Sequence, residues 1–171
     1  MKSLILVVTC VVSLSGCVSY HRPVPEGYSG PRAQLHDSVK VHSASKADFF
    51  YVSHVDGQQI EDTRIKTRVA NRGHGFNMTP VVVQRDIPVR ELTLTIVGRT
   101  DYAAPILTLT STVYQVKGDI RFTPIVGKSY VVRGELGEAF SAVWIEGPTQ
   151  GIVPGTKVEI KGPATLGVFE K

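Results

Sequence analysis

The chain has 171 residues, with 19 Lys and Arg against 15 Asp and Glu and a formal net charge of +4 at pH 7. This mild, mixed charge does not predict nucleic-acid binding, because nucleic-acid-binding proteins typically carry a larger and more clustered excess of basic residues. The two cysteines are Cys10 and Cys17, so no disulfide is expected in the rest of the chain, which must be held together by packing.

Residues 1–16 have the three parts of a secretory signal peptide. Lys2 supplies the basic start, residues 4–8 supply an apolar run, and Leu14-Ser15-Gly16 supplies the small-residue end. A bilayer-spanning helix needs about 20 apolar residues, so this stretch is too short to be an anchor. Removing these 16 residues from 171 leaves 155, which suits one domain with a hydrophobic core.

The tetrad Leu14-Ser15-Gly16-Cys17 resembles the lipobox of bacterial lipoproteins. The resemblance implies cleavage before Cys17, a diacylglycerol on its thiol and a fatty acyl chain such as palmitate on the new amino terminus, and several acyl chains anchor a protein durably. In that family an Asp after the cysteine commonly retains the product in the inner membrane. Val18 stands there instead, which implies the outer membrane, with the domain facing the periplasm. The alternative is an ordinary signal peptide cleaved near a cysteine.

Residues 17–34 are predicted to be a tether, because they are rich in Pro and Gly and carry no periodic apolar pattern. The residues that interrupt regular structure are Pro23, Pro25, Gly27, Gly30 and Pro31. Fully extended, about 16 residues reach about 55 Å. The domain that follows, residues 35–171, is therefore expected to stand clear of the lipid headgroups.

Short strands are predicted along almost all of this domain. Residues 92–96 alternate apolar and polar side chains, which is the clearest two-residue period in the chain. Further strands are predicted around residues 39–41, 49–55, 81–88, 107–109, 114–122, 130–132, 140–145, 158–160 and 166–168. Gly98 and residues 101–105 are expected to end the strand over 92–96, and a bulge or break is expected near 110–112, where the alternation changes phase.

Residues 61–72 are the one segment that competes as a helix, because Ile65 and Val69 are spaced by four and Gly73 could cap the end. A short helix or an irregular crossover is predicted there. About eight short strands without βαβ alternation predict an all-β fold, an antiparallel β-sandwich, with a small closed barrel as the alternative. Trp144 lies in the apolar run over 140–145 and is expected in the core.

The densest basic stretch precedes and enters a glycine-rich loop, Asn71 to Thr79. Two glycines around a histidine could form a backbone concavity that receives an anion. The candidate residues for binding an anion or a partner are Arg64, Lys66, Arg68, Arg72 and His74. The alternative is a solvated loop whose glycines permit positive φ and whose charges keep the sheet soluble.

No cofactor, metal or catalytic motif is predicted. Gly127-Lys128-Ser129 matches the last three residues of the phosphate-binding loop motif, but Phe122 occupies the position of the first glycine of that motif. Ser43 and Lys46 match a serine–lysine pattern whose companion motifs are missing. Zinc sites are built from Cys and His ligands, and neither a free cysteine nor a His-Glu-x-x-His helix occurs after Cys17. A hydrolase would need residues that meet only in the fold.

The mature chain resembles the small β-sandwich lipoproteins of bacterial envelopes, a likeness carried by Leu14-Ser15-Gly16-Cys17, the Pro/Gly tether and the strand and turn over residues 49–57. It implies a non-enzymatic, lipid-anchored protein with a structural, assembly or protein-interaction role and an envelope protein as partner. The alternative is a binding module for an anionic glycan or lipid that uses Arg72 to Thr79. Fold-level likeness says little about activity.

The lipobox makes a direct prediction. In the Cys17→Ser variant the thiol that would carry the diacylglycerol is gone, so the variant is expected to lose its lipid. Mass spectrometry of the intact protein purified from membranes should show the acyl chains on the parent protein only. An unlipidated parent protein of the same processed length would favour the ordinary signal peptide instead.

Overall fold

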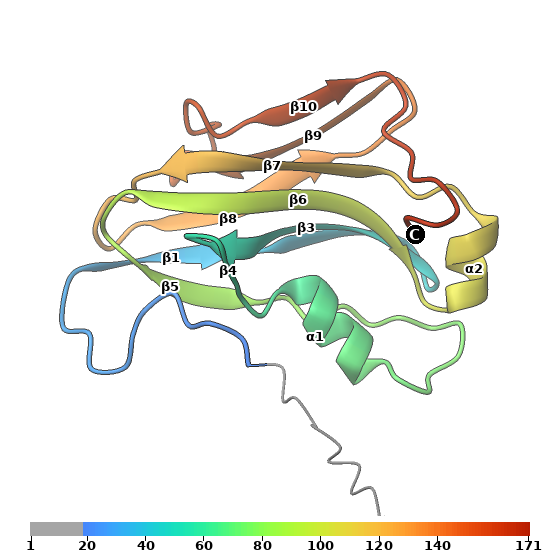
Figure 1. Cartoon of the computed structure of the whole chain (residues 1–171), viewed down its shortest axis with the longest axis horizontal. Coiled ribbons are helices and arrows are strands. Elements are labelled where there is room, and N and C mark those ends of the chain that lie inside the picture. Colours follow the sequence, from blue (N-terminus) through green and yellow to red (C-terminus); the bar gives the residue numbers. More distant parts are fainter. Residues whose placement is uncertain (1–18) are drawn as a thin grey trace, which may run out of the picture.

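The computed structural model describes residues 19–171, and two five-stranded sheets pack face to face in it (Figure 1). The predicted β-sandwich is therefore confirmed. The signal peptide and Cys17 lie outside the described residues. Within residues 19–171 no helix is long and apolar enough to span a membrane.

The strands divide between the two sheets without following the order of the chain. The first sheet has the order β10 (Val158–Lys161), β9 (Phe140–Glu146), β8 (Ser129–Glu135), β1 (Arg32–His36) and β5 (Gln84–Pro88). The second has the order β2 (Ser38–Ser43), β3 (Lys46–Val55), β6 (Leu92–Tyr102) and β7 (Gln115–Phe122), with β4 (Gln58–Gln59) paired to β3. The neighbours β1 and β8 pair in parallel and the other strand pairs are antiparallel.

The core lies between the sheets and is built from alternate residues of each strand. Leu35, Val52, Ile87, Leu94 and Ile145 come from five different strands and are completely buried in one cluster. Burial of such a side chain stabilises the fold by about 1.5–3 kcal/mol. The alternation over residues 92–96 thus predicted the buried face of β6 correctly.

Three local predictions are wrong. Gly98 does not end its strand: β6 continues to Tyr102, and a Cβ at Gly98 would come within 3.1 Å of the Phe50 ring, so the glycine makes room for that ring. Residues 107–109 are not a strand but part of the helix α2 (Pro105–Thr110), which begins with a proline whose fixed φ suits a first helical turn.

The third error is at the end of the chain, where residues 166–168 form no strand. The preceding residue Thr165 makes only an isolated bridge to Tyr114. Trp144 also departs from expectation: it is half-buried rather than in the core, because Val143 and Ile145 on either side of it point into the cluster.

The helix predicted within residues 61–72 is present as α1 (Thr63–Ala70). The Asp62 side chain accepts a hydrogen bond of 2.9 Å from the backbone N–H of Ile65, which satisfies one of the free donors at the start of the helix. Two apolar positions give the helix only a thin apolar stripe. The Asp62 cap and the burial of Thr63 and Thr67 against the domain therefore stabilise it in addition.

The segment predicted as a tether is largely attached to the domain. β1 begins at Arg32, inside the predicted range of residues 17–34, because Ala33 and Leu35 are buried on its inner side. Nearer the amino end, the backbone N–H of His21 donates a 2.9 Å hydrogen bond to the carbonyl of Gln59, and His21 pairs with Ile60 in a parallel bridge. The chain is thus held to the domain from His21 onward.

One buried ion pair joins the two sheets to α1. Asp37 lies where the chain leaves β1 in one sheet and enters β2 in the other, and its side chain is fully buried. Arg85 of β5 donates two hydrogen bonds to its carboxylate, at 2.9 and 2.7 Å. The backbone N–H groups of Val52 and Thr63 donate at 3.3 and 3.0 Å, and the Thr63 hydroxyl donates at 2.9 Å.

This arrangement predicts a large and specific loss of stability. In Asp37→Ala the Arg85 guanidinium and the donors of Thr63 and Val52 lose their acceptor in a buried place, which should cost about 3–5 kcal/mol in the free energy of unfolding. The control is Asp86→Ala, which removes the exposed partner of Arg32 (3.4 Å) and should cost at most about 1 kcal/mol. Urea unfolding measures both, and equal losses would contradict the assigned role of Asp37.

Candidate anion-binding site

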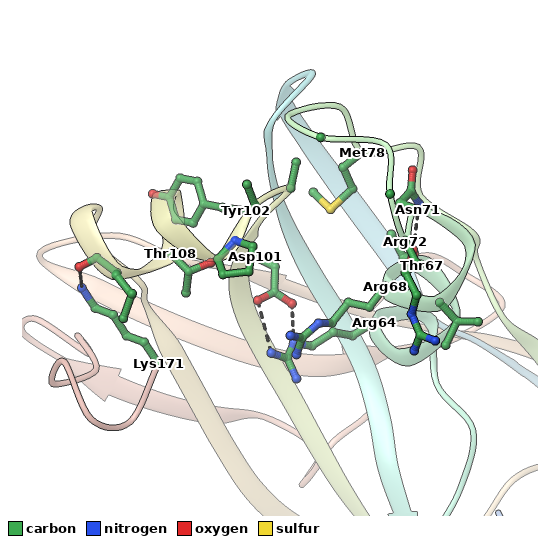
Figure 2. Close-up of a pocket in the computed structure, with 17 residues that line it drawn as sticks. Arg64, Thr67, Arg68, Asn71, Arg72, Met78, Asp101, Tyr102, Thr108 and Lys171 are labelled. Carbon is green, nitrogen blue, oxygen red and sulfur yellow. Dashed lines mark hydrogen bonds and ion pairs between the residues drawn. The ribbon is translucent and has the colours of Figure 1, made fainter.

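A hollow of about 760 Å³ opens at one end of the second sheet (Figure 2). One wall is formed by α1 and the loop that follows it, and the other by the end of β6, by α2 and by Lys171. Figure 2 shows the arginine side chains of α1 on the first wall and Tyr102, Thr108 and Lys171 on the second.

The helical period brings three of the five predicted residues together. Arg64, Arg68 and Arg72 are spaced by four, so they lie on the same side of α1 and of the turn after it, and all three line the hollow. Lys66 faces another way, pairs with Glu61 at 3.1 Å and does not line the hollow. His74 is exposed in the loop and does not line it either.

Arg64 and Asp101 line the hollow, and Arg99, which does not line it, contacts the same Asp101 carboxylate from beside it. Arg64 donates from Nε and Nη2 to the two carboxylate oxygens of Asp101, the second bond measuring 3.3 Å. The Nε atom of Arg99 lies 3.7 Å from the same carboxylate, and its Nη1 donates to the side-chain oxygen of Gln115 at 2.7 Å. Arg99 Nη2 also donates to the main-chain oxygen of Lys171 at 3.4 Å. Among the side chains of Arg64, Arg99 and Asp101, one negative charge therefore faces two positive charges.

The pKa values of these arginines reflect that imbalance. Burial opposes the charged form of Arg64, but the adjacent Asp101 carboxylate prevails and raises its pKa. Burial and then the repulsion of Arg64 lower the pKa of Arg99, with Arg68 adding to the repulsion. Arg99 Nε is also a buried donor without a hydrogen-bond acceptor among the described residues. A further negative charge placed here would relieve this repulsion.

The outer arginines are available to a ligand. Within residues 19–171, the side chains of Arg68 and Arg72 make no hydrogen bond or ion pair, and both are exposed. Lys171 on the opposite wall donates from Nζ to the carbonyls of Ser111 at 2.7 Å and Leu109 at 3.5 Å, so one of its three ammonium hydrogens has no acceptor among the described residues. Two guanidinium groups without partners among the described residues thus line a hollow that also contains the Arg64–Asp101 ion pair.

The glycine-rich loop is held in place by Asn71. Its amide nitrogen donates to the carbonyls of Thr67 and Thr79, and its amide oxygen accepts from the Thr79 N–H, each at 2.8 Å. Gly73 and Gly75 have φ of 87° and 63°, the region that glycine adopts without strain. The two glycines thus let the chain turn after α1, and the hydrogen bonds of Asn71 fix the position of the loop beside Arg72.

Residues on the second wall were missed by sequence reasoning. Asp101 falls in the predicted break after residues 92–96, and Arg99, Tyr102 and Lys171 belong to no motif. Arg64 and Asp101 are 37 residues apart and meet because β3, next to α1 in the chain, pairs with β6. A lone charge at the end of a strand of alternating residues was the only available signal.

A second polar pair joins β2 to β3 in the second sheet. His42 Nε2 lies 2.6 Å from an oxygen of the buried Asp48, whose other oxygen accepts a 2.7 Å hydrogen bond from the hydroxyl of Thr100. Among the described residues no hydroxyl or thiol is bonded to the other ring nitrogen of His42, and no three His, Cys, Asp or Glu side chains are grouped as a metal site requires.

Comparison with known proteins gives no independent guide: no family model matches the chain, and no curated protein or solved structure matches it significantly. The candidate site is therefore defined by its geometry and charge.

The helix that carries the arginines has a titrating cap. Burial of Asp62, with a smaller effect of the nearby Asp37, raises its pKa to about 6, although the hydrogen bond from Ile65 lowers it. Between pH 3.8 and about 6 the folded state therefore binds more protons at this group than the unfolded state. Since stability falls with rising pH where the folded state binds more protons, the contribution of Asp62 decreases over that window.

Asp62→Asn tests this effect, because Asn keeps the capping oxygen but does not ionise. The variant is expected to be more stable than the parent at pH 7, by up to about 3 kcal/mol for a pKa raised from 3.8 to about 6. The two proteins should converge below about pH 4. Thermal or urea unfolding at several pH values measures the difference, and a constant difference across the window would contradict a raised pKa at Asp62.

Proposed function

We propose that the protein is a lipid-anchored envelope protein that acts by binding rather than by catalysis, and that the hollow beside α1 receives an anionic group, a phosphate or a carboxylate. The observation that carries the proposal is the pair of arginines, Arg68 and Arg72, that line the hollow and have no hydrogen-bond or ion-pair partner within residues 19–171. The lipobox at Leu14 to Cys17 supports the anchor and the envelope location.

The chemistry of the site favours an oxyanion. A guanidinium presents several N–H donors in one plane, which matches a carboxylate or a phosphate in two-point contacts. The half-enclosed position of the hollow lowers the screening by water, so each contact contributes more than it would on an open surface. An oxyanion would also supply the negative charge that the cluster of Arg64, Arg99 and Asp101 lacks.

Two sources could offer that anion. An envelope protein partner could present an acidic side chain, and a glycan or lipid could present a carboxylate or a phosphate. The first fits the assembly role that the resemblance implies, and the second fits the binding module. Both would make the same contacts with Arg68 and Arg72, so binding of a small oxyanion tests the oxyanion site that the two alternatives have in common.

Calorimetric titration of the full-length lipoprotein in neutral detergent with glycerol phosphate measures this binding. In the double variant Arg68→Ala, Arg72→Ala the affinity should fall by about tenfold or more, since hydrogen bonds to charged groups contribute about 1.5–3 kcal/mol each. Added salt should weaken binding to the parent protein.

The matched control is Lys66→Ala, which removes a positive charge from the same helix but outside the hollow. It should bind glycerol phosphate as the parent does. An equal loss in Lys66→Ala would indicate attraction to the helix as a whole, and no binding by the parent protein would overturn the proposal.

A further inference from the structure

We infer that the anionic group is the phosphate headgroup of a membrane lipid, in the same leaflet that holds the lipid on Cys17, and that the side of the domain carrying α1 rests on that membrane. The inference rests on the proposed function. It adds the identity of the ligand and the orientation of the domain. Both are inferred from the short distance in sequence between Cys17 and His21, where the chain is bound to the domain.

The chain between the lipid and the domain is short. His21 is bound to the domain through Gln59 and Ile60. Cys17 precedes His21 by four residues, which span at most about 14 Å. A lipid on Cys17 would therefore keep this part of the domain within about 14 Å of the bilayer, whereas a free tether through residue 34 would allow several times that distance.

The helix α1 lies next to this point of attachment. Ile60 is separated from the first residue of α1, Thr63, by two residues. Figure 1 shows the described amino-terminal segment running on the same side of the molecule as α1, with β10 at the opposite edge. The short attachment thus brings α1 and the hollow beside it to the headgroups and keeps β10 away from them.

The surface around α1 is basic and partly apolar. The segment from Thr63 to Met78 contains Arg64, Lys66, Arg68 and Arg72 and no acidic residue. Exposed apolar side chains lie among these charges: Val69 is 61% exposed and Phe76 is 60% exposed. A basic surface with exposed apolar side chains is the pattern of segments that lie at an anionic membrane interface.

The apolar rim continues across the hollow. Leu109 of α2 lines the hollow and is 51% exposed, and Ile106, one turn earlier in the same helix, is 56% exposed. A phosphate held by Arg68 and Arg72 would thus have apolar side chains on both sides. A lipid headgroup places its phosphate directly above acyl chains, so the rim would meet apolar groups when the hollow holds the phosphate.

A single-cysteine experiment tests the inference on the lipidated protein. After processing, the chain has no cysteine other than Cys17, so an introduced cysteine is the only free thiol. Asn77→Cys places an environment-sensitive fluorophore beside Phe76 and leaves the arginines intact. Lys161→Cys, in β10, places the same fluorophore on the opposite edge. Each protein is reconstituted in vesicles that contain lipids brominated in their acyl chains.

In vesicles with phosphatidylglycerol, the fluorophore at residue 77 should be quenched by the brominated lipids and the fluorophore at residue 161 should not. Arg68→Ala with Arg72→Ala should shift the equilibrium of membrane contact by about 25-fold, since each basic residue near an anionic surface contributes about fivefold. Replacement of phosphatidylglycerol by phosphatidylcholine should weaken the quenching at residue 77.

Equal quenching at residues 77 and 161, or none at either, would overturn the inference. That result is distinguishable from failure of the proposed function, which is measured by glycerol phosphate in the absence of a bilayer. Binding of glycerol phosphate without quenching at residue 77 would leave the anion site standing and assign its ligand to a soluble partner.

Discussion

The structure depends on the buried carboxylate of Asp37, because β3, β5 and the start of α1 meet there. The chain crosses from one sheet to the other at this residue, and Arg85, Thr63 and Val52 bring β5, the start of α1 and β3 to it. A buried ion pair with all its lone pairs occupied tolerates desolvation, whereas the same charge with one partner removed does not. The hydroxyl of Thr63 extends the network by accepting from the N–H of Val83 at 2.8 Å, so the segment after the glycine-rich loop is tied to the same point.

A second carboxylate, that of Asp101, has the opposite character. The Asp37 carboxylate has one cationic partner, Arg85, and is completely buried. The Asp101 carboxylate has two cationic partners, Arg64 and Arg99, and lies beside a hollow. Balanced charge inside a protein serves packing, while unbalanced charge at a concave surface is the arrangement that binding sites use. The two networks are joined by α1, whose first residue contacts Asp37 and whose second contacts Asp101. The same helix is thus fixed at its start and presents its remaining arginines to solvent.

Local pattern predicted most of this fold and part of the site. Alternation indicated the inner face of β6, and the four-residue spacing of Ile65 and Val69 indicated the helix that carries Arg64 and Arg68. The failures share a cause, which is contact between distant segments. Gly98 lies inside β6, where the Phe50 ring occupies the space that a side chain would need, and Asp101 meets Arg64 because β3 pairs with β6. Attachment of His21 to Gln59 is likewise invisible in a segment rich in Pro and Gly.

The attachment of His21 to the domain limits how far the surface around α1 could lie from a lipid on Cys17. Electrostatic attraction between exposed charges decays over about 8 Å at physiological ionic strength, so arginines carried on a free tether of about 55 Å would spend most of their time beyond the reach of a membrane. With His21 bound, the tether is about 14 Å or less, which is comparable with the screening length. Under the proposed lipid anchor on Cys17, the arginines of this surface would be held where a headgroup phosphate can be reached. Arg68 and Arg72 have no partner within residues 19–171. With the proposed lipid on Cys17, these two charges would lie where lipid phosphates can pair with them.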